Sequence, residues 1–217
     1  MTRRPVAAGP AVLTPVVFIV DDDEELQLAL DNLFRSVGLA SRMFGSVTEF
    51  LKDVPADAPG CLVLDIRLPG VSGLEFQAQL SRTGANLPIV FMTGHGDIPM
   101  SVRAMKAGAV DFLTKPFRDQ DMLDAVSAAI EMDRRRREAD GAGREVRERY
   151  ESLSPREREV MALVTRGLMN KQVAGELGLS EITVKLYRGQ AMRKMNAASL
   201  ADLVRMAEQL ALHKERP

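Results

Sequence analysis

The chain has little of what stabilises small secreted proteins or binds soft metals. Its 217 residues include one cysteine, Cys61, two histidines and no tryptophan. A single cysteine excludes an internal disulfide framework, and one cysteine with two histidines is too few for a zinc site. These absences favour a reducing, cytoplasmic setting, in which Cys61 is a core residue rather than a redox sensor.

Long hydrophobic runs are also missing. No segment approaches the 18 or so apolar residues of a membrane span, so no membrane partner is expected. The apolar stretch from Val6 to Val20 is interrupted by prolines and runs directly into the acidic cluster at residues 21–25, which does not match a signal peptide. Residues 1–14 are therefore predicted to be a disordered leader.

The net charge is close to zero, but the two signs are unevenly distributed. Residues 1–130 carry 11 basic and 16 acidic side chains, residues 131–150 carry 7 and 6, and residues 151–217 carry 11 and 8. The sequence thus predicts an acidic front domain and a mildly basic tail, for which nucleic acid is a candidate partner.

The front part alternates short apolar runs with helical patterns. The runs are Val16–Val20, Leu39–Met43, Cys61–Leu64, Ile89–Met92 and Val110–Leu113. Helical patterns follow from about Leu26, Ser46 (the start of a capping box), Gly73, Ile98 and Asp119. Five such alternations predict an α/β fold, a five-stranded, doubly wound parallel sheet with helices on both faces.

Polar residues follow four of the predicted strands. They are Asp21, Asp22 and Asp23 after the first, Asp65 after the third, Thr93 after the fourth and Lys115 after the fifth. Function in such sheets lies beyond the carboxyl ends of the strands, so these side chains are expected to share one crevice.

Each acid alone has a structural explanation. Asp23 could complement a helix dipole and Asp65 could be a turn residue. Several carboxylates in one crevice differ, because two charges about 4 Å apart repel by roughly 4 kcal/mol at an effective dielectric of about 20. Such a cluster predicts a bound cation, for which Mg²⁺ suits the oxygen ligands. With the Thr93 hydroxyl and the Lys115 ammonium, the crevice could receive a phosphoryl group on a carboxylate.

Four segments carry a family resemblance. Phe18-Ile19-Val20-Asp21-Asp22-Asp23, Leu64-Asp65-Ile66-Arg67-Leu68-Pro69-Gly70, Met92-Thr93-Gly94-His95-Gly96 and Phe112-Leu113-Thr114-Lys115-Pro116 together resemble the receiver domain of two-component response regulators, with a flavodoxin-like fold. We expect this domain to span residues 15–130.

The resemblance implies a role for each matching position. Asp65 would be the phosphoacceptor, assisted by Thr93 and Lys115. Asp22, Asp65 and the Arg67 backbone carbonyl would hold Mg²⁺, with Asp21 beside them; Thr93 and Phe112 would form the switch, and the Lys115–Pro116 bond would be cis. A sensor histidine kinase would donate the phosphate, and phosphorylation would favour a homodimer.

Residues 131–150 are predicted to be a linker that is helical in part. The segment Gly141-Ala142-Gly143 breaks the pattern of the fifth helix, which resumes at Val146. The basic run Arg134–Arg137 is interpreted as a solvated face, and direct DNA contact is the less favoured alternative.

The tail, residues 151–217, predicts an all-α domain of four helices. Ser154-Pro155-Arg156-Glu157 is a capping box that starts the first helix, which ends at Gly167. Asn170 is expected to cap the helix Lys171–Leu177, and Ser180 the helix Glu181–Met195; Leu200–Leu212 would be the last. Two short helices joined through Gly178 are typical of a helix-turn-helix.

The third tail helix has distinct faces. Val184, Tyr187, Ala191 and Met195 are predicted to be core residues, whereas Lys185, Leu186, Gly189 and Arg193 face outward. A basic outward face suits the major groove of DNA and its phosphates.

Three segments of the tail resemble the LuxR-type DNA-binding domain. They are Leu-Ser-Pro-Arg-Glu-Arg-Glu-Val from Leu153, Gly-Leu-Met-Asn-Lys-Gln-Val-Ala from Gly167 and Thr183-Val184-Lys185. Receiver and tail together resemble the NarL/FixJ response regulators, nearest the FixJ-like branch. The resemblance implies that Lys185, Leu186 and Gly189 approach bases, while Arg188, Arg193 and Lys194 contact phosphates.

Two departures affect the DNA sequence that is read. Tyr187 replaces the usual histidine, and Gly189 removes a side chain from the reading face. Leu186 can contact a thymine methyl but cannot hydrogen-bond a base.

The leading interpretation is a phosphorylation-switched transcription regulator, not an enzyme, with RNA polymerase as a further candidate partner. An alternative is a Mg²⁺-dependent phosphatase, but the crevice offers no second catalytic acid or base. Another is a DNA- or partner-binding protein that acts without phosphorylation. The intact set of Asp65, Thr93 and Lys115 disfavours it.

Overall fold

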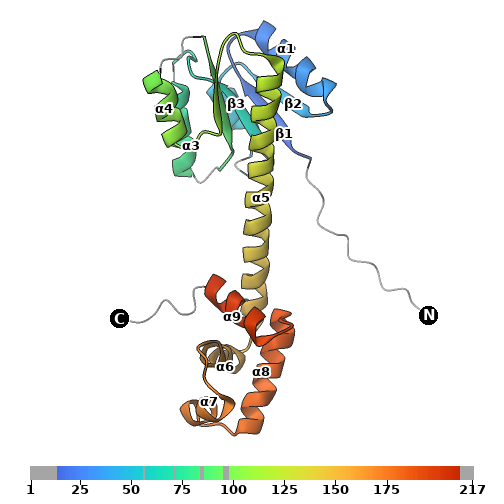
Figure 1. Ribbon diagram of the computed structural model, residues 1–217, viewed down its shortest axis with the longest axis vertical. Helices are drawn as coiled ribbons and strands as arrows, with labels where there is room; N and C mark the ends of the chain where they lie inside the picture. Colours follow the sequence, from blue (N-terminus) through green and yellow to red (C-terminus); the bar gives the residue numbers. More distant parts are fainter. Residues whose placement is uncertain (1–13, 56, 71, 84–85, 95–97, 211–217) are drawn as a thin grey trace, which may run out of the picture. The chain divides into compact units, whose positions relative to one another are not determined.

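The computed structural model describes residues 14–55, 57–70, 72–83, 86–94 and 98–210 (Figure 1). Contacts divide the chain into two compact units, Met1–Arg136 and Arg137–Pro217. The predicted leader, apart from its last residue, and the predicted end of the last helix at Leu212 lie outside the described residues. No helix within these ranges is both long and apolar enough to cross a membrane.

The first unit is built on the predicted sheet. Its strands are β1 (Val16–Val20), β2 (Ala40–Phe44), β3 (Gly60–Asp65), β4 (Ile89–Thr93) and β5 (Asp111–Thr114). They pair in parallel in the order β2-β1-β3-β4-β5. The predicted fold is confirmed, and the strand ends differ from the prediction by one residue at most. β3 and β4 are buried along their whole length, as continuous apolar runs in a parallel sheet require.

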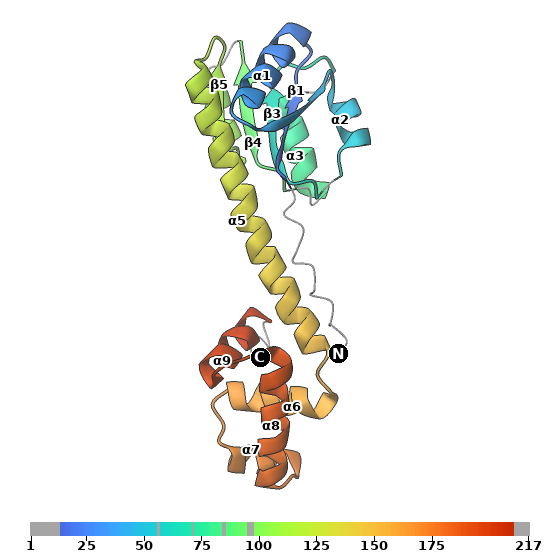
Figure 2. The ribbon, with the colours of Figure 1, turned by 90° about the vertical axis from the view of Figure 1, so that its right-hand side faces the viewer.

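Helices cover both faces of this sheet (Figures 1 and 2). They are α1 (Glu24–Ser36), α2 (Val47–Asp53), α3 (Gly73–Thr83), α4 (Ile98–Lys106) and α5 (Asp119–Glu151). Apolar side chains of α1 and α5 form one core cluster with alternate residues of the strands, including the fully buried Cys61. Side chains of α2, α3 and α4 form a second cluster on the opposite face.

The fifth helix is longer than the sequence predicts. Residues 131–150 are helical throughout, so Gly141 and Gly143 do not interrupt α5. Each glycine costs a helix about 1 kcal/mol relative to alanine. Ion pairs within the helix, such as Arg149 with Glu145, and the burial of Val146 in the second unit's core offset this cost.

The second unit is the predicted four-helix domain. It contains α6 (Pro155–Thr165), α7 (Asn170–Leu177), α8 (Glu181–Met195) and α9 (Leu200–Gln209), with the last turns of α5. The Ser154–Glu157 capping box is present, and Gly178 closes α7 at a φ of 66°, in the left-handed region that glycine adopts without strain.

Two predicted helix starts differ in detail. Asn170 is the first residue of α7 rather than its cap. The cap is Met169, whose N–H donates to the Gln172 side chain at 2.8 Å. At α2, Ser46 caps the helix as predicted, but Glu49 accepts from the Gly45 N–H, so the capping box is incomplete.

Candidate functional site

An acidic crevice lies at the carboxyl ends of β1 and β3. The strand order reverses direction between these two strands, and ligands of such sheets bind at that point. β1 leads directly into Asp21 and Asp22, and Asp65 is the last residue of β3. One carboxylate oxygen from each of the three lies within 4.8 Å of the other two. The structure therefore brings together three of the four acids that the sequence placed in one crevice. The fourth, Asp23, caps α1, where its side chain accepts from the N–H groups of Glu25 and Leu26.

The three carboxylates have different exposure. Asp21 and Asp65 are buried, whereas Asp22 is exposed to solvent. Burial raises the pKa of Asp21, an effect opposed by the hydrogen bond from Lys115 and the one from the Asp23 N–H. The crevice is thus lined by buried acids at its base and open on the side of Asp22.

Lys115 is bonded to both buried acids. Its Nζ lies 2.7 Å from Asp21 Oδ2 and 2.6 Å from Asp65 Oδ2. The Lys115–Pro116 peptide bond is cis, as the resemblance implied. Burial lowers the pKa of Lys115, but its bonds to Asp21 and Asp65 together outweigh that effect and raise it above the ordinary value, so the ammonium is charged at neutral pH.

Backbone groups fix the position of Asp65. Its Oδ1 accepts from the Arg67 N–H at 2.7 Å, leaving Oδ2 to Lys115. Gly73, at the start of α3, packs directly against the end of β3, because a Cβ there would lie 2.8 Å from the Asp65 carbonyl oxygen. The Asp65 carboxylate is therefore held by the Arg67 N–H and by Lys115, and its backbone is held by the close contact with Gly73.

The two predicted switch residues lie on neighbouring strands. Thr93 is fully buried at the end of β4, and its carbonyl accepts from the Lys115 N–H at 2.7 Å. Phe112 on β5 is partly buried and packs against the cluster below α4. His95 and Gly96 of the same motif lie outside the described residues.

One residue that positions the crevice was missed by sequence reasoning. Gln27 of α1 is buried, and its Nε2 donates to the carbonyls of Asp21 (2.5 Å) and Phe44 (2.8 Å). It thereby ties the ends of β1 and β2 together. The available signal was a polar side chain on the helix face otherwise occupied by Leu30 and Phe34.

The charges in the crevice do not balance. Three carboxylates face one ammonium, so the cluster has room for a further positive charge. Carboxylate oxygens with an open, solvated side are the donors that Mg²⁺ prefers. The acidic pocket that receiver domains use for this ion is therefore present in the chain, and its donors fit the ion.

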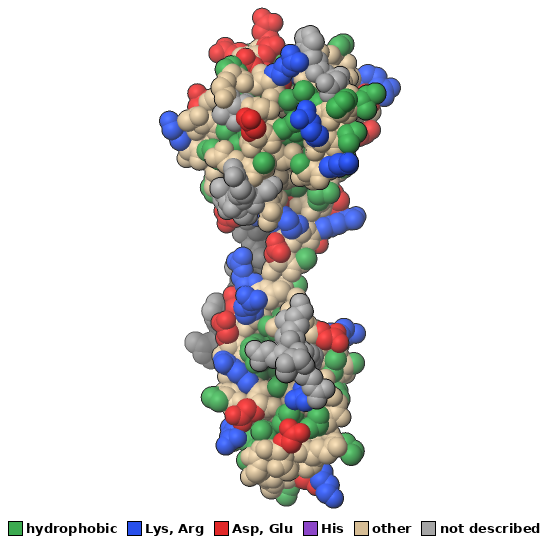
Figure 3. Space-filling view, turned by 90° about the vertical axis from the view of Figure 1, so that its left-hand side faces the viewer, with side chains coloured by type: hydrophobic (Ala, Val, Ile, Leu, Met, Phe, Trp, Pro, Cys, Tyr) green, Lys and Arg blue, Asp and Glu red, His purple; other side chains and the backbone are tan. Residues whose placement is uncertain are grey.

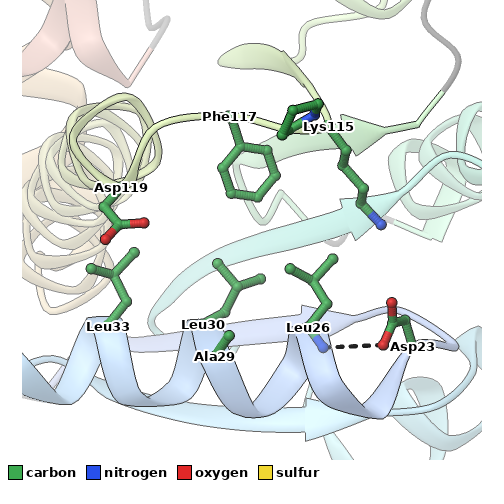
Figure 4. Close-up of a pocket in the computed structure, with 9 residues that line it drawn as sticks. Asp23, Leu26, Ala29, Leu30, Leu33, Lys115, Phe117 and Asp119 are labelled. Carbon is green, nitrogen blue, oxygen red and sulfur yellow. Dashed lines mark hydrogen bonds between the residues drawn. The ribbon is translucent and has the colours of Figure 1, made fainter.

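A hollow of about 510 Å³ adjoins the crevice (Figure 4). Leu26, Ala29, Leu30 and Leu33 of α1 line one wall, and Phe117 stands opposite them. Lys115 also lines this hollow, so an apolar surface begins where the charged crevice ends.

The outward face of α8 carries the predicted DNA-binding residues. Lys185, Leu186, Gly189 and Arg193 are all exposed, while Val184, Ala191 and Met195 are buried and Tyr187 is partly buried, as predicted.

Two of the predicted phosphate contacts are engaged within the second unit. Arg188 Nη1 donates to Asn170 Oδ1 at 3.3 Å. Lys194 Nζ lies 2.7 Å from Glu157 Oε2, which also accepts from the Ser154 N–H at the start of α6. No local pattern indicates the Glu157–Lys194 pair, because the two residues are 37 positions apart.

Comparison with known families matches both halves of the chain. Residues 17–127 match the response regulator receiver domain, and residues 151–207 match the bacterial regulatory proteins of the luxR family. The chain belongs to the response regulators. This family consists of regulators with a phosphate-accepting receiver, and the LuxR-type domain makes this response regulator a DNA-binding transcription regulator rather than an enzyme.

Individual response regulators are similar over nearly the whole chain. Nodulation protein W of Bradyrhizobium diazoefficiens is 60% identical over 91% of this chain and 87% of its own. The transcriptional regulatory protein FixJ of Azorhizobium caulinodans is 45% identical over 88% of this chain and 90% of its own. The solved structure of the response regulator StyR is 48% identical, with a TM-score of 0.83 over 90% of this chain and 99% of its own. The predicted FixJ-like branch is confirmed.

Proposed function

We propose that this response regulator is switched by phosphorylation of Asp65, with a sensor histidine kinase as the donor. The observation that carries the proposal is the contact of Lys115 Nζ with Asp65 Oδ2 at 2.6 Å beside Asp21 and Asp22. A nucleophilic carboxylate next to a fixed cation suits phosphoryl transfer, which depends mainly on positioning and charge.

In the transfer, an Asp65 carboxylate oxygen forms a bond to phosphorus while the bond from phosphorus to the donor breaks and the donor keeps its electron pair. The Arg67 N–H orients the carboxylate. Lys115 exchanges one carboxylate oxygen for an oxygen of the arriving phosphoryl group, and so remains paired before and after the step. The apolar hollow beside Lys115 offers the donor protein a surface on which to pack.

Mg²⁺ is the proposed cofactor. Asp22, Asp65 and the backbone carbonyl of Arg67 would hold it, with Asp21 beside them. When bound, the ion neutralises negative charge on the carboxylates and on the phosphoryl oxygens. These residues would hold it on the open side of the crevice, where Asp22 is exposed.

Phosphorylation is proposed to favour a homodimer through Thr93 and Phe112. Thr93 would bind the phosphoryl group, and Phe112 would repack against α4. Apolar side chains of α4 support a role in association, because Ile98, Val102 and Met105 are exposed. Figure 3 shows hydrophobic side chains among Lys and Arg on the face of the first unit that carries α4.

The proposed output is promoter binding by α8. Lys185, Leu186 and Gly189 would approach bases, and Arg188, Arg193 and Lys194 would contact phosphates of double-stranded DNA. RNA polymerase is a further proposed partner. The proposal divides the chain into a receiver at residues 15–130, a linker at residues 131–150 and a DNA-binding domain at residues 151–217. It also places the protein in the cytoplasm.

Intact-mass analysis tests the proposal. The full chain is incubated with a small acyl phosphate, with and without Mg²⁺, beside Asp65→Asn and the exposed control Asp57→Asn. One Mg²⁺-dependent phosphoryl adduct is expected in the wild type and in Asp57→Asn, and none in Asp65→Asn. An adduct that survives in Asp65→Asn would contradict the assignment of the phosphoacceptor. Phosphate-dependent dimerisation, measured by light scattering, should likewise be lost in Asp65→Asn.

A further inference from the structure

Two apolar side chains stand on the outward face of α8. Ile182 and Leu186 are 83% and 56% exposed and lie one helical turn apart. Both share this face with Lys185, Gly189 and Arg193. Isolated exposed leucines are common on protein surfaces, so exposure alone carries no argument.

Gly189, on the same face, supplies an independent observation. A Cβ built at Gly189 meets no described atom within 4 Å, and the backbone there is ordinary helix rather than left-handed. Neither crowding within the chain nor backbone conformation therefore accounts for this glycine. In a helix interior it costs about 1 kcal/mol relative to alanine. Its one evident effect is to leave space beside Leu186 for another surface to come close.

Three polar side chains near this surface are engaged within the second unit. Arg188 is bonded to Asn170, Lys194 to Glu157, and the Thr183 hydroxyl to Ser180. Besides Lys185 and Arg193, the outward face presents Ile182 and Leu186 and, at Gly189, a position without a side chain. In the major groove, the apolar group that distinguishes one base from the others is the C5 methyl of thymine.

We propose that Ile182 and Leu186 recognise thymine methyl groups in the major groove, and that Gly189 allows the helix to approach closely enough for these contacts. This inference rests on the proposed DNA-binding function of α8 and specifies its chemistry. Lys185 and Arg193, which flank the apolar pair, bind the neighbouring phosphates or guanines. The preferred half-site therefore contains thymines at fixed positions that no hydrogen bond from α8 reads.

The test replaces individual thymines by deoxyuracil, which removes the methyl and leaves base pairing intact. The full-length protein, treated with a small acyl phosphate, first selects its preferred duplexes from a random pool. Dissociation constants are then measured at one salt concentration for duplexes with single replacements. At two thymines of each half-site we expect affinity to fall about fourfold, which corresponds to roughly 0.8 kcal/mol for one buried carbon. The wild-type comparison changes only the DNA, so it requires no variant to fold.

Three variants assign the contacts. Leu186→Ala should lose the penalty at one of these thymines and Ile182→Ala the penalty at the other. Leu200→Ala, an exposed leucine of the same unit, should keep both penalties.

The outcomes separate this inference from the function on which it rests. Selective binding that no thymine replacement weakens would overturn the inference and leave the DNA-binding function standing. The inference would also be overturned if Ile182→Ala and Leu186→Ala keep both penalties but lose polymerase-dependent transcription. The two side chains would then contact a protein rather than thymine methyl groups. Failure to select any duplex over random DNA would overturn the DNA-binding function, and the inference with it.

Discussion

In each unit a lysine is bonded to a buried carboxylate, and these two lysines, Lys115 and Lys194, differ in their surroundings. Lys115, in the first unit, is 22% exposed and contacts two aspartates that are themselves almost fully buried. Lys194, in the second, is 43% exposed and contacts one glutamate. The first lysine is outnumbered by three carboxylates in its crevice, whereas the second forms a balanced pair.

This difference separates the proposed phosphorylation site from a structural contact. The Glu157 carboxylate also caps α6, so its bond to Lys194 joins the start of α6 to the end of α8. The single positive charge of Lys194 neutralises the single negative charge of Glu157, so this pair needs no further cation. The receiver crevice keeps an excess of negative charge, which is costly to bury and would be offset by a bound cation. The number of carboxylates around each lysine thus distinguishes the two sites, whereas the presence of an ion pair does not, because both sites have one.

Removing the two lysines should give the largest contrast. In Lys115→Met, the rate of phosphorylation of Asp65 by a small acyl phosphate should fall about 10²- to 10³-fold, because a fixed positive charge next to the reacting oxygen is lost. The measurement is the time course of the phosphoryl adduct by intact mass. Lys194→Met is the matched control and should phosphorylate at the wild-type rate. Equal rates in all three proteins would show that Lys115 has no part in the transfer.

Two glycines, one crowded and one open, extend the comparison of the two units. A Cβ at Gly73 would meet backbone atoms, whereas a Cβ at Gly189 would meet none within 4 Å. Gly73→Ala should destabilise the chain by about 1–3 kcal/mol, since the new methyl meets the backbone of Asp65 and Ile66. Gly189→Ala meets nothing and should stabilise α8 by up to about 1 kcal/mol while weakening DNA binding. Urea denaturation measures both changes. A stabilised Gly73→Ala would mean that α3 can move away from β3 without cost.

The pH dependence of the balanced pair follows from Glu157. Burial raises the pKa of Glu157, but the bonds from Lys194 and Ser154 outweigh it and hold the pKa below the ordinary value of 4.5. The stabilisation is therefore fully present above pH 4.5 and is lost as the pH falls through the lower, folded value. Glu157→Gln keeps a side-chain oxygen for the Ser154 N–H but loses the ion pair with the partly exposed Lys194, so it should cost about 0.5–1 kcal/mol at pH 7. Its deficit relative to the wild type should shrink on acidification, and a deficit independent of pH would contradict the assignment.

The smallest expected effect concerns salt. Lys194 is bound to Glu157, whereas Arg193 forms no ion pair with any residue in the described part of the chain. Arg193→Met should reduce the slope of log affinity for DNA against log salt by about 1, as expected for one lost phosphate contact. Lys194→Met should change the slope less, because its charge is already partly neutralised. A larger change for Lys194 would show that the Glu157 pair opens on DNA.

The crevice and the sheet could be predicted from local sequence, because β1, β3 and β4 are largely continuous apolar runs that end at or lead into a polar residue. The positions of Asp21, Asp65 and Lys115 at one edge then follow from the parallel order of the strands. The role of Gln27 and the pairing of Glu157 with Lys194 could not be assigned in this way. Phe44 lies 17 positions from Gln27 and Lys194 lies 37 positions from Glu157, and no local pattern identifies such a distant partner.

The unbroken course of α5 through residues 131–150 could not be predicted from the sequence either. Gly141 and Gly143 are correctly read as poor helix formers, but a penalty of about 1 kcal/mol each is smaller than what the surrounding ion pairs and the burial of Val146 provide. The prediction that Asn170 caps α7 was wrong for a similar reason, because contacts elsewhere decide where the helix begins. Gln172 supplies the cap contact, so Asn170 can enter the helix and bind Arg188.

The exposed pair Ile182 and Leu186 has a consequence for modified DNA. A side chain that senses only a C5 methyl cannot tell thymine from 5-methylcytosine, since both carry the same group at the same edge of the groove. Methylation of a cytosine at one of these positions should therefore strengthen binding where unmodified cytosine is rejected. The promoters available to this regulator would then depend on the methylation state of the genome as well as on its sequence.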